Sequence, residues 1–243
     1  SGNDLQVPEI NATLLGGALK VKGGSQKDGR VLITANGSIN VEQLRKQFAS
    51  PLLANLSGAT PYRGEVRINK RNADLVIDST LVGLASAFPE PFNKEAGESM
   101  PLRLEKKLLP LVPPVRGEKA DPTVRDQLSA SLGSVMSMQL IRRKQAGGFV
   151  PERGAIAVGR PLQLPERGVT FGLTARRIDL DYWRRVYRSA GAVAAPVAVP
   201  ATVPSAAVPS TAVQAAAAAP ASPFLDSINI KTADLILLGH HFN

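Results

Sequence analysis

The chain has 243 residues, 44% of them hydrophobic, so it can bury a core, and disorder along its whole length is excluded. It contains no cysteine, which excludes disulfides, thiolate metal sites and a cysteine nucleophile. The formal net charge of +9 suits acidic partners such as nucleic acid, anionic lipid headgroups or acidic proteins. With 21 glycines, 19 prolines and only 5% aromatic residues, the composition favours short strands and many turns.

Alternation of polar and apolar residues predicts strands through most of the chain. Residues 18–22 and 30–35 flank a glycine-rich turn and predict a hairpin. Residues 63–69 and 73–78 form a second such pair around a polar turn. An antiparallel meander is the simplest assembly, so we expect a mainly β fold. Further candidate strands lie at 102–105, 127–142, 154–158 and 169–175.

Two short segments, near 40–49 and 179–188, are predicted to be amphipathic helices. Asn40 and Asp179 are suitable N-caps, since a side-chain oxygen there can accept from the free amides of the first turn. Apolar residues then recur at helical spacing opposite basic ones, so each helix should lie half-buried on the sheet. The two apolar stripes are Val41, Leu44 and Phe48, and Leu180, Trp183 and Tyr187.

The segment 189–222 contains no charged residue, but its recurrent prolines exclude a continuous membrane-spanning helix. Its Ala, Pro, Val, Ser and Thr composition predicts a flexible linker. Strand character returns in 223–243, which we expect to be a strand pair that continues the sheet. The predicted organisation is therefore a β-rich segment at 3–188, this linker, and the final pair.

No pattern of residues predicts catalysis, a cofactor or a metal ion. The two histidines, His240 and His241, are neighbours on a predicted strand, where they would point to opposite faces and could not easily chelate one ion. The basic clusters Lys106-Lys107 and Arg142-Arg143-Lys144 are expected to belong to a solvated face. Aromatic rings are not interleaved with these clusters, so no nucleic-acid binding is expected. The chain is therefore expected not to be an enzyme.

Several motifs resemble one known family. The motifs are Leu56-Ser-Gly-Ala-Thr-Pro-Tyr-Arg-Gly-Glu-Val, Leu75-Val-Ile-Asp-Ser-Thr-Leu-Val-Gly-Leu-Ala-Ser, Pro89-Glu-Pro-Phe-Asn-Lys and Met100-Pro-Leu-Arg-Leu. They resemble the YhdP branch of the AsmA-like proteins, which are very large envelope proteins of Gram-negative bacteria. The likeness covers the first half and the last few residues, whereas 115–167 contains no matching motif.

The resemblance implies a strongly curved, repeating antiparallel sheet whose concave face is an apolar groove for phospholipid acyl chains. It also implies an inner-membrane anchor outside this chain, a periplasmic location and phospholipid movement between the two membranes. Neighbouring repeats of the full-length protein would pair with the open sheet edges. The residues that we expect to face lipid are Val31, Ile33, Val66, Ile68, Leu75 and Ile77.

An alternative to lipid contact remains for these apolar side chains. They could cover one another or the two helices, as in an ordinary core. The segment would then be a structural or protein-interaction module of the same envelope protein, without direct lipid contact.

Overall fold

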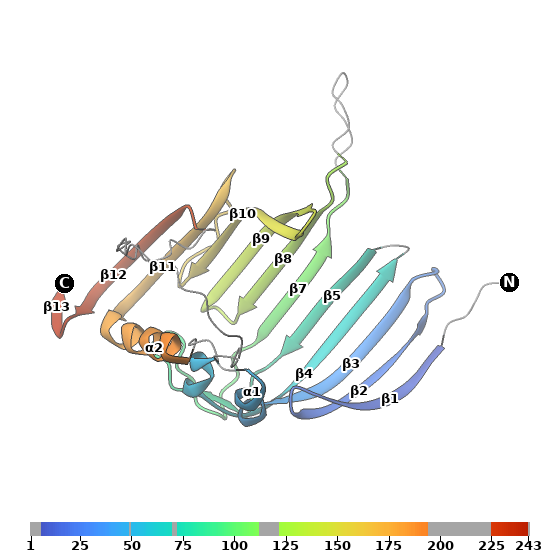
Figure 1. Ribbon diagram of the computed structural model, residues 1–243, viewed down its shortest axis with the longest axis horizontal. Coiled ribbons are helices and arrows are strands. Elements are labelled where there is room, and N and C mark those ends of the chain that lie inside the picture. Colours follow the sequence, from blue (N-terminus) through green and yellow to red (C-terminus); the bar gives the residue numbers. More distant parts are fainter. Residues whose placement is uncertain (1–5, 49, 70–71, 112–121, 194–224, 243) are drawn as a thin grey trace, which may run out of the picture.

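The computed structural model describes residues 6–48, 50–69, 72–111, 122–193 and 225–242. Within them, thirteen strands form one open, mainly β structure (Figure 1), in the order β1-β2-β3-β4-β5-β7-β8-β9-β10-β11-β12-β13, with β6 paired to β4. The strands are β1 (Gln6–Leu14), β2 (Gly17–Ser25), β3 (Val31–Asn40), β4 (Leu56–Asn69), β5 (Asn72–Ser79), β6 (Leu84–Ser86), β7 (Leu102–Leu108), β8 (Arg125–Leu132), β9 (Met136–Gln145), β10 (Gly148–Val158), β11 (Gly168–Asp179), β12 (Ser227–Leu237) and β13 (His240–Phe242). The helices are α1 (Val41–Gln47), the 3₁₀ helix η1 (Pro51–Asn55) and α2 (Leu180–Val193).

The two predicted hairpins are present as β2–β3 and β4–β5. Periodicity alone left 127–142 undivided; the structure splits it into β8 and β9 around a turn in which Gly133 has a φ of +50°. The predicted C-terminal strand pair is also present, but one long strand, β12, runs through both predicted segments, and the short β13 completes the pair. Much of 115–167, where no motif was recognised, therefore belongs to the sheet.

The expected antiparallel meander is correct for most strands but not at the C-terminal side of the sheet. There β10 pairs with β11, and β11 with β12, in parallel. Parallel neighbours need a connection that returns to the starting end of the sheet. Residues 159–167 make this return before β11, and α2 with the chain after it separates β11 from β12. Alternation within a strand contains no information about this choice of direction.

The pairing register gives the sheet two different faces. Directly opposed residues of neighbouring strands share a face, and successive residues alternate between faces. Ile33, Val66 and Leu75 are opposed on one face, which we call the apolar face. Thr34 and Glu65 are opposed on the other, which we call the polar face.

Both helices begin at the predicted caps. Asn40 Oδ1 accepts from the backbone N–H groups of Glu42 and Gln43, at 2.9 and 3.3 Å. Asp179 Oδ1 accepts from the N–H of Tyr182 at 2.7 Å. These bonds satisfy amides that have no partner inside the helix.

The far ends of the two helices differ from the prediction. Helix α1 stops at Gln47, so Phe48, which was assigned to the apolar stripe, lies beyond the helix and is 52% exposed. Helix α2 continues to Val193, so residues 189–193 of the predicted linker are helical. The rest of that linker, and the side chain of Tyr187, lie outside the described residues.

Helix α2 is held against distant parts of the chain by an aromatic cluster. The Trp183 ring stacks on Phe88, with centroids 5.6 Å apart, and meets Phe92 edge-on at 6.1 Å. The Tyr182 hydroxyl lies 2.8 Å from Asn55 Oδ1 and 2.9 Å from the Ala87 carbonyl oxygen. Since four strands separate β5 from β11 in the sheet, these contacts place η1, the chain after β5 and the start of α2 together over one end of the strands (Figure 1). We call α1, η1, residues 81–100 and the first turn of α2 the cap.

Asp181 ties the cap to the last strand pair. Its carboxylate accepts from the backbone N–H groups of Leu238 and Gly239, at 2.9 and 2.8 Å, in the turn between β12 and β13. These two hydrogen bonds lower the pKa of Asp181, because they stabilise its ionised form.

Replacing Trp183 with Ala should lower the free energy of unfolding by about 3 kcal/mol, because it removes the ring that packs against Phe88 and Phe92. Urea denaturation of the chain measures this change. Arg184→Ala, an exposed neighbour on the same helix, should stay within about 0.5 kcal/mol of the parent. Equal losses for the two variants would contradict the proposed role of the aromatic cluster.

Acidification should weaken the link between α2 and the β12–β13 turn. The folded pKa of Asp181 lies below its ordinary value of about 3.8, so the stabilisation is complete above that value and is lost as the pH falls through the folded pKa. The difference in unfolding free energy between the parent and Asp181→Asn should therefore shrink from about pH 5 to about pH 2. A difference that stayed constant over this range would contradict this assignment.

Candidate functional site: an apolar face beside a capped cavity

The structure brings the six predicted lipid-facing residues together on three neighbouring strands. Val31 is opposed to Ile68, Ile33 to Val66, and Val66 to Leu75, while Ile77 follows Leu75 on the same face of β5. All six are half-buried. Their side chains therefore form one continuous apolar patch on the apolar face of β3, β4 and β5, and contact with acyl chains there stays a prediction.

The cap does not cover this patch. Its cavity touches β3 at Ile39 and β4 at Thr60, each six residues along the strand from the patch residues Ile33 and Val66. Six residues of a strand span about 20 Å. None of the six residues lines the cavity beneath the cap.

The apolar face extends from the patch to both edges of the sheet. On β1, Ile10 and Leu14 are 50% and 47% exposed. On β12, Ile228 and Ile230 are 64% and 49% exposed. Soluble proteins seldom leave so wide an apolar surface exposed unless it has a binding role. Between these edges, the same face continues through Leu104, Leu128, Ala130, Met138, Leu140, Ile156, Phe171 and Leu173.

A cavity of about 450 Å³ lies between the cap and the sheet. Leu102 and Leu132 form part of its floor, and the next residues of the apolar face on these strands are Leu104 and Ala130. The apolar lining thus passes from the cavity to the open face without a polar break on β7 and β8. The cavity is lined by Ile39, Val41, Leu44, Leu52, Leu56, Thr60, Leu81, Leu84, Ser86, Phe88, Phe92, Lys94, Met100, Leu102, Leu132 and Trp183.

Lys94 is the charged side chain in the wall of this cavity. It is only 4% exposed, and its Nζ donates to the backbone carbonyls of Leu84 and Glu95, at 2.7 and 2.8 Å. Burial lowers its pKa, because an ammonium loses solvation there, and the nearby charge of Glu98 partly opposes that effect. Since both carbonyls belong to the cap, Lys94 has a structural role in holding the cap together.

A charged cluster lies at the opposite end of the apolar face. Asp126 is fully buried, and its carboxylate accepts from Arg142 Nε and Nη2, at 2.9 and 2.6 Å. The guanidinium of Arg142 and the ammonium of Lys106 lie 5.3 and 5.9 Å from the centre of the Phe149 ring, within range of cation–π attraction.

Our expectation of a solvated basic face was wrong for Lys106 and Arg142, which are half-buried. Lys106 and Arg142 point to the apolar face, whereas their neighbours Lys107 and Arg143 point to the polar face. The reason is the period of two within a strand, which sends adjacent basic residues in opposite directions. The alternation along β7 and β9 could have assigned Lys106 and Arg142 to the apolar face. The sequence did not show that both strands bring a cation to Phe149.

The polar face carries alternating charges that neutralise one another. Glu65 pairs with Arg63 and Arg67, at 2.8 and 2.7 Å, and Arg103 lies 2.8 Å from Asp78. Such exposed pairs contribute little to stability, about 0 to 1 kcal/mol each. This face suits contact with water.

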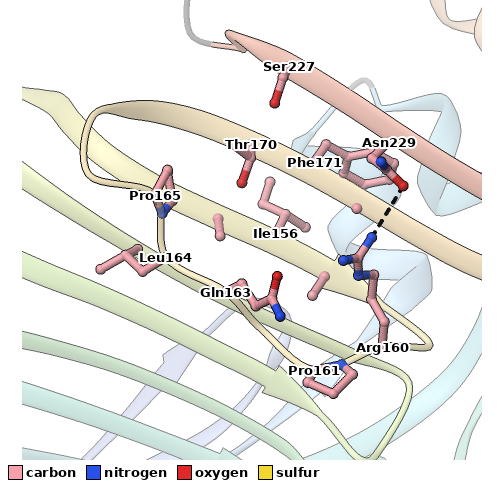
Figure 2. A pocket seen from close by; sticks show the side chains of 13 residues that line it. Ile156, Arg160, Pro161, Gln163, Leu164, Pro165, Thr170, Phe171, Ser227 and Asn229 are labelled. Carbon is pink, nitrogen blue, oxygen red and sulfur yellow. Dashed lines mark hydrogen bonds between the residues drawn. The ribbon is translucent and has the colours of Figure 1, made fainter.

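A second hollow, of about 360 Å³, lies on the polar face where residues 160–167 cross β10 and β11. Figure 2 shows Arg160 directed to Asn229, and its Nη1 donates to Asn229 Oδ1 at 3.3 Å. Among the described residues that line the hollow there is no carboxylate and no histidine, so an acid–base pair is not assembled there.

The described ranges contain no group of three or more His, Cys, Asp or Glu side chains that could hold a metal ion. His241 instead lies 3.0 Å from Asp234, with Nδ1 facing Oδ1, and Asp234 also accepts from Arg177. None of the described helices has both the length and the apolar character needed to cross a membrane.

Replacing Arg142 with Met should lower the free energy of unfolding by about 3 kcal/mol, because it leaves the buried carboxylate of Asp126 without its partner. Adding Asp126→Leu to that variant should recover much of the loss, since no buried charge is then uncompensated. Denaturant titration of the two variants tests this. A double variant that is no more stable than Arg142→Met would contradict the pairing.

The comparisons with known proteins are consistent with one family. The model of the family described as YhdP protein matches residues 1–243, including the stretch 115–167. No curated protein and no solved structure matches the chain. The chain therefore belongs to the YhdP family, within the AsmA-like group of bacterial envelope proteins.

Proposed function

We propose that this chain is a non-enzymatic segment of an envelope protein, and that its apolar face guides phospholipid acyl chains between the inner and outer membranes. In this proposal the segment lies in the periplasm, and an anchor outside this chain holds the protein in the inner membrane. The observation that supports it most strongly is the half-exposed apolar face, which runs from the edge at β1 to the edge at β12.

The chemistry of this apolar patch suits a sliding ligand. Its six residues are aliphatic and offer no directional hydrogen bond, so a hydrocarbon chain would keep similar contacts as it moves along the face. Burying half of a 16-carbon chain would yield about 6 kcal/mol, at roughly 0.8 kcal/mol for each methylene. Such a gain is large enough to extract a chain from water and small enough to permit release.

The two buried ionisable side chains, Lys94 in the cap and Asp126 at the opposite end of the apolar face, also favour guidance over catalysis. Lys94 donates to two backbone carbonyls, and Asp126 is held by Arg142. General acid–base catalysis needs a titratable group that can exchange a proton with a substrate. These two groups are instead held in structural contacts.

The alternative is a structural or protein-interaction module without lipid contact. The sheet edges support it, because Leu238 and Phe242 at the β12–β13 end are 65% and 54% exposed. Open edges offer unpaired backbone groups to a neighbouring strand. In the full-length protein, neighbouring repeats would be the partners. Capture of a specific partner by a lipid-free chain would favour this alternative.

Aspartate substitutions on the two faces separate these functions. The chain purified from a bacterial host should carry phospholipid, detected by native mass spectrometry and lipid extraction, and Ile33→Asp or Ile68→Asp should abolish it, because a carboxylate on the apolar face repels hydrocarbon. Leu32→Asp is the matched control, since Leu32 is also half-buried but lies on the polar face, opposite Arg67.

The control should retain lipid, and circular dichroism should show that all three variants are folded. A parent chain without lipid would favour the structural module. Lipid that persists in folded Ile33→Asp and Ile68→Asp would place the binding surface elsewhere.

A further inference from the structure

The cations on strands β7 and β9 of the apolar face meet at one end of it, far from the cap. Lys106 extends from β7 and Arg142 from β9, and both lie over the ring of Phe149 on β10. Leu102 on β7 and Leu132 on the neighbouring β8 lie at the capped end, in the floor of the cavity. The apolar face at these strands therefore has a cationic end and an apolar, covered end.

The charges of this cluster do not balance among the described residues. Asp126 supplies one negative charge and binds Arg142 through Nε and Nη2, which leaves Nη1 able to donate elsewhere. Lys106 contacts the Phe149 ring, and attraction to a ring does not neutralise the ammonium. Two cations with one carboxylate leave a net positive charge, and the exposed Lys144 adds another on the same face. This end of the face is therefore complementary to an anion.

The length of the apolar track fits one acyl chain. Leu102 and Lys106 are four residues apart on β7, and Leu132 and Asp126 are six apart on β8, which corresponds to about 13 to 20 Å. The acyl region of one membrane leaflet is about 15 Å deep, half of a hydrocarbon core of roughly 30 Å. A phosphate at the cationic end would thus place the end of its acyl chain near the cavity.

The capped end does not compete for the phosphate. Its cation, Lys94, is 4% exposed and already donates to two carbonyls of the cap. The remaining lining there is almost entirely aliphatic or aromatic. Only one orientation therefore pairs an anion with a cation and hydrocarbon with hydrocarbon.

We infer that Lys106 and Arg142 form a headgroup site that holds the phosphate of a phospholipid, with an acyl chain lying along β7 and β8 toward the cavity beneath the cap. This inference rests on the proposed function, because it assigns a position and an orientation to the lipid on the same face. The cluster would act as a stopping point on an otherwise sliding surface, since a charged hydrogen bond has a direction that methylene contacts lack.

The test compares a phospholipid with an uncharged lipid of the same chains. Phosphatidylglycerol and diacylglycerol, each brominated at the chain end and presented in neutral detergent, are titrated against the 243-residue chain. Trp183 is the single tryptophan and lines the cavity, so quenching of its fluorescence reports an acyl end that reaches the cavity.

The matched variants are Lys106→Gln and Lys107→Gln, adjacent residues on opposite faces. Lys106→Gln should weaken phosphatidylglycerol binding about tenfold and leave diacylglycerol binding unchanged, because it removes one charged donor to the phosphate. Lys107→Gln should change neither. Lys106→Arg keeps the charge and should retain binding, which guards against a variant that fails only through misfolding.

The outcomes separate the two proposals. If phosphatidylglycerol and diacylglycerol quench Trp183 equally, and Lys106→Gln affects neither, the headgroup site is refuted while the lipid-binding face stands. If neither lipid binds the parent chain, the proposed function fails, and this inference fails with it. If inorganic phosphate binds Lys106 as tightly as the lipid does, the site is one for free phosphate, and the assignment to a lipid is overturned.

Discussion

The structure depends on strand pairing, which satisfies the backbone amides and carbonyls of the inner strands while their side chains alternate between the two faces. The register of β3, β4 and β5 opposes aliphatic residues such as Ile33, Val66 and Leu75 on one face and places charged residues such as Glu65 and Asp78 on the other. A slip of one residue in the pairing of a strand would move its apolar side chains to the polar face. The apolar pattern of each strand therefore specifies its register. An apolar face built in this way must be covered, either by protein or by a ligand.

Within the described part of the chain, the cap covers one end of that face. The cap places Trp183, Phe88 and Phe92 over the strand ends, and between them and the sheet leaves a cavity of about 450 Å³. Asp181 and Tyr182 then tie the helix that carries Trp183 to the β12–β13 turn and to η1. The surface is thus enclosed beneath the cap, open at the patch on β3, β4 and β5, and charged at Lys106 and Arg142, with Lys106 directly opposed to Leu75 of the patch.

The two faces use charge in different ways. On the polar face, ion pairs such as those of Glu65 are exposed and cancel locally, so they maintain solubility without directing a ligand. On the apolar face, the Asp126–Arg142 pair is largely desolvated and leaves a neighbouring ammonium unneutralised. One unpaired cation beside hydrocarbon attracts an anion more strongly than several paired charges in water, because the effective dielectric constant beside hydrocarbon is lower.

The sequence by itself determined the local features of this protein. Alternation located the hairpins β2–β3 and β4–β5 and placed Val66 and Ile68 on one face of their strand, because the period of two is a property of each strand alone. The caps Asn40 and Asp179 were predictable for the same reason, since each bonds to amides two or three residues away. The family motifs likewise lay in short continuous segments, and the family match extends to the whole chain.

Only the tertiary structure decided which distant segments meet. The parallel pairing of β11 with β10 and β12 requires the connections before and after β11 to lead back to the end of the sheet where the preceding strand began. Alternation within a strand contains no information about the path of these connections. The contact of Tyr182 with Asn55 joins residues 127 positions apart, and the meeting of Lys106 with Phe149 crosses two intervening strands. The sequence shows which side of its own strand a residue takes, but contacts of this range depend on the order of all the strands between. That order placed the cavity at one end of the apolar face and the cations at the other.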